Sequence, residues 1–94
     1  MPAKAGFFYL SRVSTKLTIY IREGCHLCDD MEQALREYES DLDFETQRVS
    51  IDNDPQLEQA YGSKVPVLVH DAVEICHYFL DMQALKQALQ QVRN

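Results

Sequence analysis

The sequence predicts a three-layer α/β sandwich built on a mixed four-stranded sheet, with its elements in the order β-α-β-α-β-β-α. Runs rich in β-branched and aromatic residues, typical of strands, alternate with stretches whose apolar residues recur every three or four positions, as in helices. A strand joined through a helix to the next strand favours a parallel pair with a right-handed crossover. The last two strands are joined by a tight connection, which requires an antiparallel hairpin.

The first three elements are expected between residues 17 and 51. Leu17–Ile21 is a buried strand, because it is rich in β-branched and aromatic residues. An amphipathic helix of about 14 residues follows. Its apolar face comprises Leu27, Met31, Ala34, Leu35 and Tyr38, of which Met31, Leu35 and Tyr38 are expected in the core. After a break at Asp41 and Asp43, Phe44–Ile51 shows weaker alternation, which predicts an edge strand.

A short second helix is expected after residue 53. Asp54 is its N-cap and Pro55 its first residue, since the missing N–H of proline is harmless there. Leu57, Ala60 and Tyr61 share one face, and Gly62 is expected in the left-handed conformation just past the last turn.

The final segment predicts a hairpin and a third helix. Val65–Val69 and Val73–His77 are the two strands, and Asp71 and Ala72 form the tight connection. Asp81 caps the last helix. The apolar face of that helix comprises Met82, Leu85, Ala88, Leu89 and Val92.

Length and composition indicate one small globular domain. The chain has 94 residues, 46% of them hydrophobic and 26% charged, and no apolar run approaches a membrane span. We expect residues 1–15 to be an N-terminal extension of unknown role and residues 16–94 to form a single domain. The protein is expected to be a monomer that does not associate with membranes.

Charge and cysteine content narrow the function classes. From residue 23 onward there are five basic and fifteen acidic side chains, which would repel a phosphate backbone and argue against nucleic-acid binding. Three cysteines are too few for a disulfide-dense secreted scaffold, so a reducing, cytoplasmic location is expected.

Chemistry is expected where the first strand turns into the first helix, at Gly24-Cys25-His26-Leu27-Cys28. Unpaired backbone N–H groups at a helix N-terminus favour a thiolate, which would lower the pKa of Cys25 and make it the nucleophile. One helical turn brings Cys28 alongside as the resolving thiol. An imidazolium at His26 would stabilise the thiolate further, whereas Glu23, Asp29 and Asp30 oppose it, so the redox poise stays open.

Two other interpretations of the CxxC pair need residues that the sequence does not place correctly. Zinc would need a second half from Cys76, His77 or His70, and no second CxxC or HxxxH spacing is present, so no metal site is predicted. Haem attachment needs a His directly after the second Cys, where Asp29 stands. Cys76 is expected to be an inert buried residue, and His70 and His77 to lie at the surface or cap an element.

Three segments together make the chain similar to the glutaredoxin-like branch of the thioredoxin superfamily, in particular to small bacterial glutaredoxin-related proteins. They are Tyr20–Cys28, Asp52–Pro55 and Lys64–Leu68, and the resemblance covers roughly residues 16–92. It implies a thioredoxin/glutaredoxin-like sandwich with a cis-proline at Pro66 facing the CxxC pair. A cis bond there would leave the Val65 backbone free to pair with an extended peptide or with glutathione.

The same resemblance suggests further site residues. Arg22 matches the position of a Lys that favours the thiolate and a glutathione carboxylate, and Lys64 and Asp81 are candidate glutathione contacts. The chain departs from the family pattern at His26-Leu27, where glutaredoxins have Pro-Tyr, and at Lys64, where they have Thr. His77–Asp81 also lacks their Gly pair, so bulky side chains are expected to occupy the groove that binds glutathione.

The sequence therefore predicts a thiol-disulfide oxidoreductase that acts on protein or glutathione disulfides without a bound organic cofactor. Glutathione or a reductase would return the electrons. Two alternatives stay open. One is a non-catalytic thioredoxin-fold module whose cysteines bind a metal or sense oxidation. The other is glutathione transfer to or from proteins by Cys25 alone.

Overall fold

The structure, a computed structural model, describes residues 15–93 and the side chains of residues 15–91. Seven elements follow in the predicted order: β1 (Thr15–Ile21), α2 (His26–Leu42), β2 (Phe44–Ser50), α3 (Pro55–Tyr61), β3 (Val67–His70), β4 (Val73–His77) and α4 (Met82–Arg93). The predicted N-terminal extension lies outside the described residues except for Thr15, which is the first residue of β1.

The four strands form one mixed sheet in the order β2-β1-β3-β4. β1 runs parallel to β2, with Thr15 opposite Phe44 and Ile21 opposite Ser50. β3 is antiparallel to β1 and to β4. The parallel pair, the antiparallel hairpin and the edge position of β2 are all confirmed.

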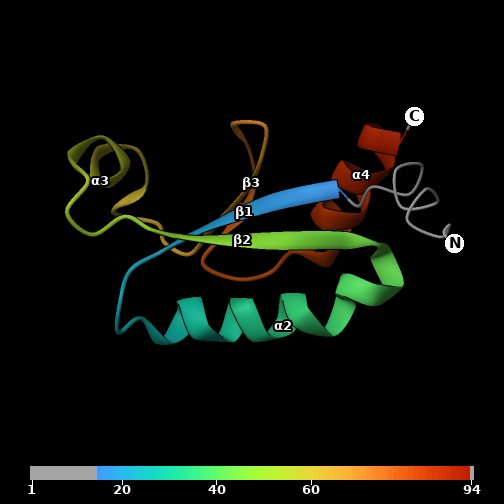
Figure 1. Cartoon of the computed structure of the whole chain (residues 1–94), viewed down its shortest axis with the longest axis horizontal. Helices are drawn as coiled ribbons and strands as arrows, with labels where there is room; N and C mark the ends of the chain where they lie inside the picture. The colour runs from blue at the N-terminus through green and yellow to red at the C-terminus, as the bar shows by residue number, and fades with distance from the viewer. Residues whose placement is uncertain (1–14, 94) are drawn as a thin grey trace, which may run out of the picture.

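The main core lies on one face of the sheet. Alternate residues of β1 are fully buried there, as period-two alternation requires. They join side chains from both long helices in one cluster, whose members include Leu17, Ile19, Ile21, Met31, Leu35, Leu85 and Leu89. In Figure 1, α2 runs along this sheet beneath β1 and β2.

The short helix α3 completes the third layer. Its Tyr61 ring stacks on the Tyr20 ring, with centroids 4.5 Å apart, and Tyr20 projects from the face of β1 opposite the main core. Val67 of β3 pairs with Tyr20, so it lies on the same face. In Figure 1, α3 and the beginning of α2 lie at the same end of the sheet, where both parallel strands finish.

The predicted helix caps and the tight hairpin connection are confirmed. Asp54 accepts hydrogen bonds from the backbone N–H groups of Gln56 and Leu57 at 3.1 and 3.2 Å, and Asp81 accepts one from Ala84 at 3.0 Å. Asp71 and Ala72 have positive φ angles of 49° and 68°, as a tight hairpin connection of this kind requires.

Two local predictions were wrong. Gly62 is right-handed, with φ −56° and ψ −32°, so it is not there for a left-handed turn. A Cβ at this position would lie 2.5 Å from the Glu58 carbonyl oxygen, so lack of space explains the glycine. Tyr38 is 37% exposed and not a core residue, whereas Met31 and Leu35 are buried as predicted.

Element boundaries also differ. α2 has 17 residues instead of about 14, because it continues through the predicted break at Asp41 to Leu42, which packs against the core. β3 begins at Val67, two residues later than predicted, because Val65 and Pro66 precede the ladder. Among residues 15–93, no helix is long and apolar enough to cross a membrane.

Candidate active site

The CxxC pair lies where β1 turns into α2. Gly24 takes a positive φ of 74°, which glycine adopts without strain, and this turn places Cys25 at the N-cap of α2 in an extended conformation. Cys25 and Cys28 form a disulfide, with their Cα atoms 5.2 Å apart. The helix therefore brings the two sulfur atoms together, as the three-residue spacing predicts.

The two sulfur-bearing residues differ in exposure and in hydrogen bonding. Cys28 is 1% exposed and belongs to the main core, whereas Cys25 is only partly buried. The Cys25 Sγ accepts a hydrogen bond of 3.1 Å from the Cys28 backbone N–H. One of the unpaired N–H groups at the start of a helix thus points at the more accessible sulfur.

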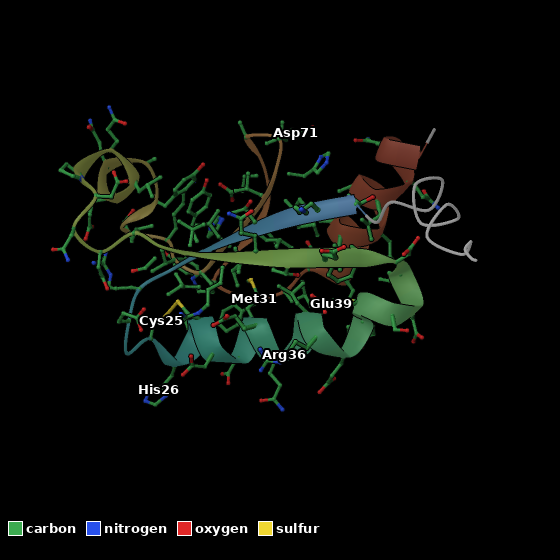
Figure 2. All side chains as sticks on the ribbon, in the orientation of Figure 1. Cys25, His26, Met31, Arg36, Glu39 and Asp71 are labelled. Carbon is green, nitrogen blue, oxygen red and sulfur yellow. A yellow bond between two sulfur atoms is a disulfide. The ribbon has the colours of Figure 1, made fainter. Side chains whose placement is uncertain are left out.

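His26 is the first residue of α2 and is exposed. Figure 2 shows its imidazole pointing outward from the start of the helix, on the side away from the body of the protein. Its proposed influence on Cys25 would therefore act through space at the helix start, with no hydrogen bond between them in this structure.

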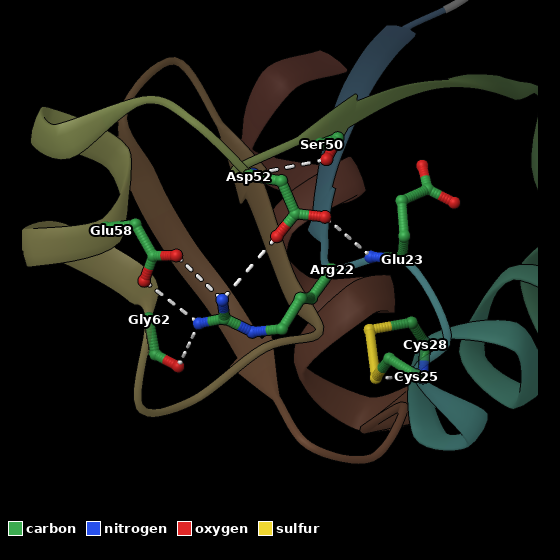
Figure 3. Close-up of polar contacts among 8 residues, drawn as sticks. All are labelled: Arg22, Glu23, Cys25, Cys28, Ser50, Asp52, Glu58 and Gly62. Carbon is green, nitrogen blue, oxygen red and sulfur yellow. Dashed lines mark hydrogen bonds and ion pairs between the residues drawn. A yellow bond between two sulfur atoms is a disulfide. The ribbon is translucent and has the colours of Figure 1, made fainter.

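Arg22 is held by an ion-pair network on the α3 side of the site (Figure 3). Its guanidinium donates two hydrogen bonds to the Glu58 carboxylate, at 2.7 and 3.0 Å, and a third to the Gly62 carbonyl at 3.0 Å. It also pairs with Asp52 at 3.5 Å. The hydrogen bonds from Arg22 lower the pKa of Glu58, and the same contacts raise the pKa of Arg22.

Asp52 connects this network to the loop that carries the cysteines. One of its carboxylate oxygens accepts a 3.1 Å hydrogen bond from the Glu23 backbone N–H, two residues before Cys25. In Figure 3 the guanidinium points toward Glu58 and away from the disulfide. The predicted role of Arg22 beside the thiolate stays a prediction, and its partners in the structure are acidic side chains and a backbone carbonyl.

The peptide bond between Val65 and Pro66 is cis, which agrees with the resemblance. Because Val67 pairs with Tyr20, the two residues before β3 lie beside the end of β1, from which the cysteine loop continues. Val65 and Cys25 both pack, partly buried, against the main core. The Pro66 carbonyl is already used, since it accepts a 2.9 Å hydrogen bond from the Tyr78 backbone N–H.

Lys64, the other basic residue predicted at the site, is also in an ion pair. Its Nζ lies 2.7 Å from a carboxylate oxygen of Glu74 on β4, and the second oxygen of Glu74 lies 2.5 Å from Nδ1 of His77. The hydrogen bond from Lys64 is the main cause that lowers the pKa of Glu74, and the contact with His77 adds to it. His77 is exposed, in agreement with a surface position.

The segment between β4 and α4 forms an apolar wall next to the site. A small cavity of about 80 Å³ separates it from the first turns of α2. Its lining includes Leu27, Asp30, Met31, Tyr78, Phe79 and Leu80. Phe79 is 68% exposed on this wall, in the segment where glutaredoxins carry the Gly pair. The Asp81 carboxylate caps α4.

Sequence reasoning missed the acidic partners Glu58 and Glu74. Glu58 lies 36 residues from Arg22 along the chain, and no local pattern signals such a pair. Glu74 is three residues from His77, a spacing that could have suggested their contact, but its bond to Lys64 spans the hairpin.

The third cysteine and the other histidines do not join the pair. Cys76 is buried in β4, and burial raises the pKa of its thiol, in agreement with the inert role expected. Within the described part of the chain, no group of three or more His, Cys, Asp or Glu side chains is placed to hold a metal ion.

Comparison with known proteins supports this architecture. Residues 16–90 match the model of a family described as "Glutaredoxin-like domain (DUF836)". The chain belongs to this family. Among curated proteins, none matches the sequence.

Solved structures agree with the family assignment. Protein Ne2328 from Nitrosomonas europaea is 40% identical, with a TM-score of 0.73, over 80% of this chain and 91% of that one. Protein XcR50 from X. campestris is 36% identical, with a TM-score of 0.65, over 80% of this chain and 96% of that one. Thioredoxin 1 from Thermosipho africanus is 12% identical, with a TM-score of 0.56, over 85% of this chain and 100% of that one, and shows the shared thioredoxin fold.

Proposed function

We propose that this glutaredoxin-like protein is a thiol-disulfide oxidoreductase in which Cys25 is the nucleophile and Cys28 the resolving thiol. The observation that carries the proposal is the asymmetry of the pair. The sulfur of Cys25 caps a helix, accepts a backbone hydrogen bond and is partly accessible, whereas Cys28 is buried beside it. A hydrogen bond from a backbone N–H favours a thiolate over a thiol.

The reaction is a two-step exchange. In the reduced protein the Cys25 thiolate attacks one sulfur of a substrate disulfide, forms a mixed disulfide and releases the first substrate thiolate. The Cys28 thiol then loses its proton and attacks the Cys25 sulfur, which releases the second substrate thiolate. Two electrons pass from the dithiol to the substrate, and the protein is left with the Cys25–Cys28 disulfide.

Neighbouring groups would assist substrate binding and recycling. The backbone of Val65, beside the cis-proline, would pair with an extended segment of the substrate next to its disulfide. A thiol donor, either glutathione or a reductase in the cytoplasm, would restore the dithiol by the reverse exchange.

A redox titration tests the proposal. The protein is equilibrated with glutathione buffers of graded potential, and its thiols and bound zinc are counted at each point. We expect a reversible two-electron couple between about −270 and −120 mV, the range of known redoxins. One zinc per chain with both thiols unreactive would instead support the non-catalytic module.

Replacing Cys28 separates the dithiol route from the monothiol route. In Cys28→Ser the mixed disulfide should form but not resolve, so a stable adduct on Cys25 should accumulate and protein disulfides should not turn over. Unimpaired turnover of a glutathione mixed disulfide by this variant would favour the monothiol route. Cys76→Ala is the matched control and should behave like the unmodified protein, because its thiol is buried and is not part of the disulfide.

A further inference from the structure

The cations at the site end of the sheet are held by acidic side chains of the same chain, and this bears on which disulfides the site accepts. We propose that Glu58 and Glu74 are specificity-determining residues: by neutralising Arg22 and Lys64 they make the site discriminate against disulfides with carboxylates near the sulfur atoms, in favour of apolar or cationic ones. The proposal rests on the exchange function above and names its substrate class.

Arg22 is already bound by two acidic side chains and a backbone carbonyl. Glu58 accepts one hydrogen bond from each terminal nitrogen of the guanidinium, at 2.7 and 3.0 Å. The Gly62 carbonyl accepts a third, and the Asp52 carboxylate lies 3.5 Å away. A substrate carboxylate would have to displace a two-point contact whose geometry fits the planar guanidinium. It would also approach two carboxylates already present.

Lys64 is likewise paired with an acidic side chain. Its ammonium group is 2.7 Å from Glu74, and that carboxylate also binds His77. Lys64 directly precedes Val65 and the cis-proline, so its charge lies where a substrate segment bound to the Val65 backbone would pass. Glu74 cancels this charge within the chain.

Apart from the exposed His26, the other exposed side chains next to the cysteines in sequence are acidic or apolar. Glu23, Asp29 and Asp30 are exposed on either side of the cysteines. The apolar wall is provided by Leu27, Tyr78 and Phe79, with Asp30 at the same cavity. Apolar groups flanking a substrate disulfide can contact this wall, and basic groups are attracted by the acids, whereas carboxylates are repelled by them.

Three small disulfides of different charge test the idea: hydroxyethyl disulfide (neutral), glutathione disulfide (anionic) and cystamine (cationic). The pre-reduced protein is mixed with each in excess, and the rate of mixed-disulfide formation at Cys25 is measured. Each reaction releases one small thiolate, and Cys28 then releases the second, so the electron balance is the same for all three. Comparing variant with unmodified protein for each reagent cancels differences in intrinsic reactivity.

In E58Q/E74Q, the rate with glutathione disulfide should rise on the order of threefold to tenfold at low salt, and the rate with cystamine should fall by a similar factor. The rate with hydroxyethyl disulfide should stay unchanged. Both charge effects should largely disappear at 1 M salt, where the screening length is about 3 Å. E74Q alone, at an exposed strand position, should show a smaller change in the same direction even if the double variant folds poorly.

E37Q/E45Q is the matched control, since it also removes two negative charges, but at positions far from the disulfide. Residue 37 is twelve positions along α2 from Cys25, about 18 Å at 1.5 Å per residue, and residue 45 pairs with Lys16 at the far end of β1. Its three rates should change by less than about twofold. Identical shifts in both variants, or rates in E58Q/E74Q that keep their original ratios, would overturn the specificity proposal alone. No reaction of the unmodified protein even with hydroxyethyl disulfide would overturn the exchange function and this proposal with it.

Discussion

The beginnings of α2 and α3 use the same structural device for different ends. At α3 the carboxylate of Asp54 accepts two backbone hydrogen bonds, at 3.1 and 3.2 Å, and Pro55 follows it. At α2 the Sγ of Cys25 occupies the same capping position and accepts one bond at 3.1 Å. The oxygen of Asp54 only stabilises its helix. The sulfur of Cys25 does the same, but it is also an atom that can react while it contacts the backbone N–H donors. Under the proposed function, the start of α3 is therefore only structural, whereas the start of α2 also takes part in the reaction.

Replacing the sulfur cap by an oxygen cap gives the largest expected effect. Cys25→Ser should lower disulfide exchange to the uncatalysed background, because the nucleophile is gone, while α2 stays capped since Ser is a favoured N-cap residue. The measurement is reduction of hydroxyethyl disulfide, with circular dichroism as the check on folding. Residual exchange well above background in this variant would show that Cys25 is not the nucleophile.

The other end of α3 gives the next largest effect. Gly62→Ala would place a Cβ 2.5 Å from the Glu58 carbonyl oxygen and 2.7 Å from its Oε1, so either the helix end or the Arg22 contact must shift. We expect a loss of about 1–2 kcal/mol in the free energy of unfolding. Denaturant melts of the oxidised proteins measure it. Ala60→Ser, at an exposed position of the same helix, is the control and should cost less.

Removing the oxygen cap itself should cost somewhat less. Asp54→Ala leaves two backbone N–H groups without their side-chain partner, which should lower the free energy of unfolding by about 1 kcal/mol. Asp54→Asn keeps a capping oxygen and should stay near the unmodified value. Equal stability of the Ala variant and the unmodified protein would mean that the α3 cap contributes nothing, and the contrast between the two helix starts would then lose its structural half.

The smallest expected effect is the loss at low pH of the stability that the Glu58 and Glu74 ion pairs contribute. The pKa values of Glu58 and Glu74 are lowered below their ordinary 4.5, by hydrogen bonds from Arg22 and from Lys64 respectively. A lowered carboxyl pKa contributes stability above the unfolded-state value, and this stability is lost as pH falls through the folded-state value. Melting temperatures of the unmodified protein and E58Q/E74Q should therefore converge as the pH falls below 4.5 and through the lowered pKa values. A constant difference between pH 7 and pH 3 would contradict this.

Local sequence signals predicted the elements and the cysteine pair because each depends on neighbours within one or two turns. Asp54, Pro55 and Asp81 act through backbone groups two to four residues away, and Cys25 and Cys28 through a single turn of α2. The cis bond at Pro66 was implied by family resemblance and not by composition.

Predictions failed where distant residues decide the outcome. Gly62 follows a helix, which suggested a left-handed turn, yet it is right-handed, and its carbonyl accepts a hydrogen bond from Arg22, 40 residues earlier. Periodicity located Tyr38 on the inner face of α2 but could not tell how far the covering surface extends. The pairing of Arg22 and Lys64 with acids from α3 and β4 likewise depends on tertiary structure.

The buried position of Cys76 offers an internal reporter. The chain has three cysteines, so once the other two are joined, this residue carries the sole remaining thiol. An alkylating reagent added to the oxidised protein can label it only when β4 separates from the core. The labelling rate, read as a single mass increment, would therefore measure how often this hairpin opens under native conditions, with no engineered probe.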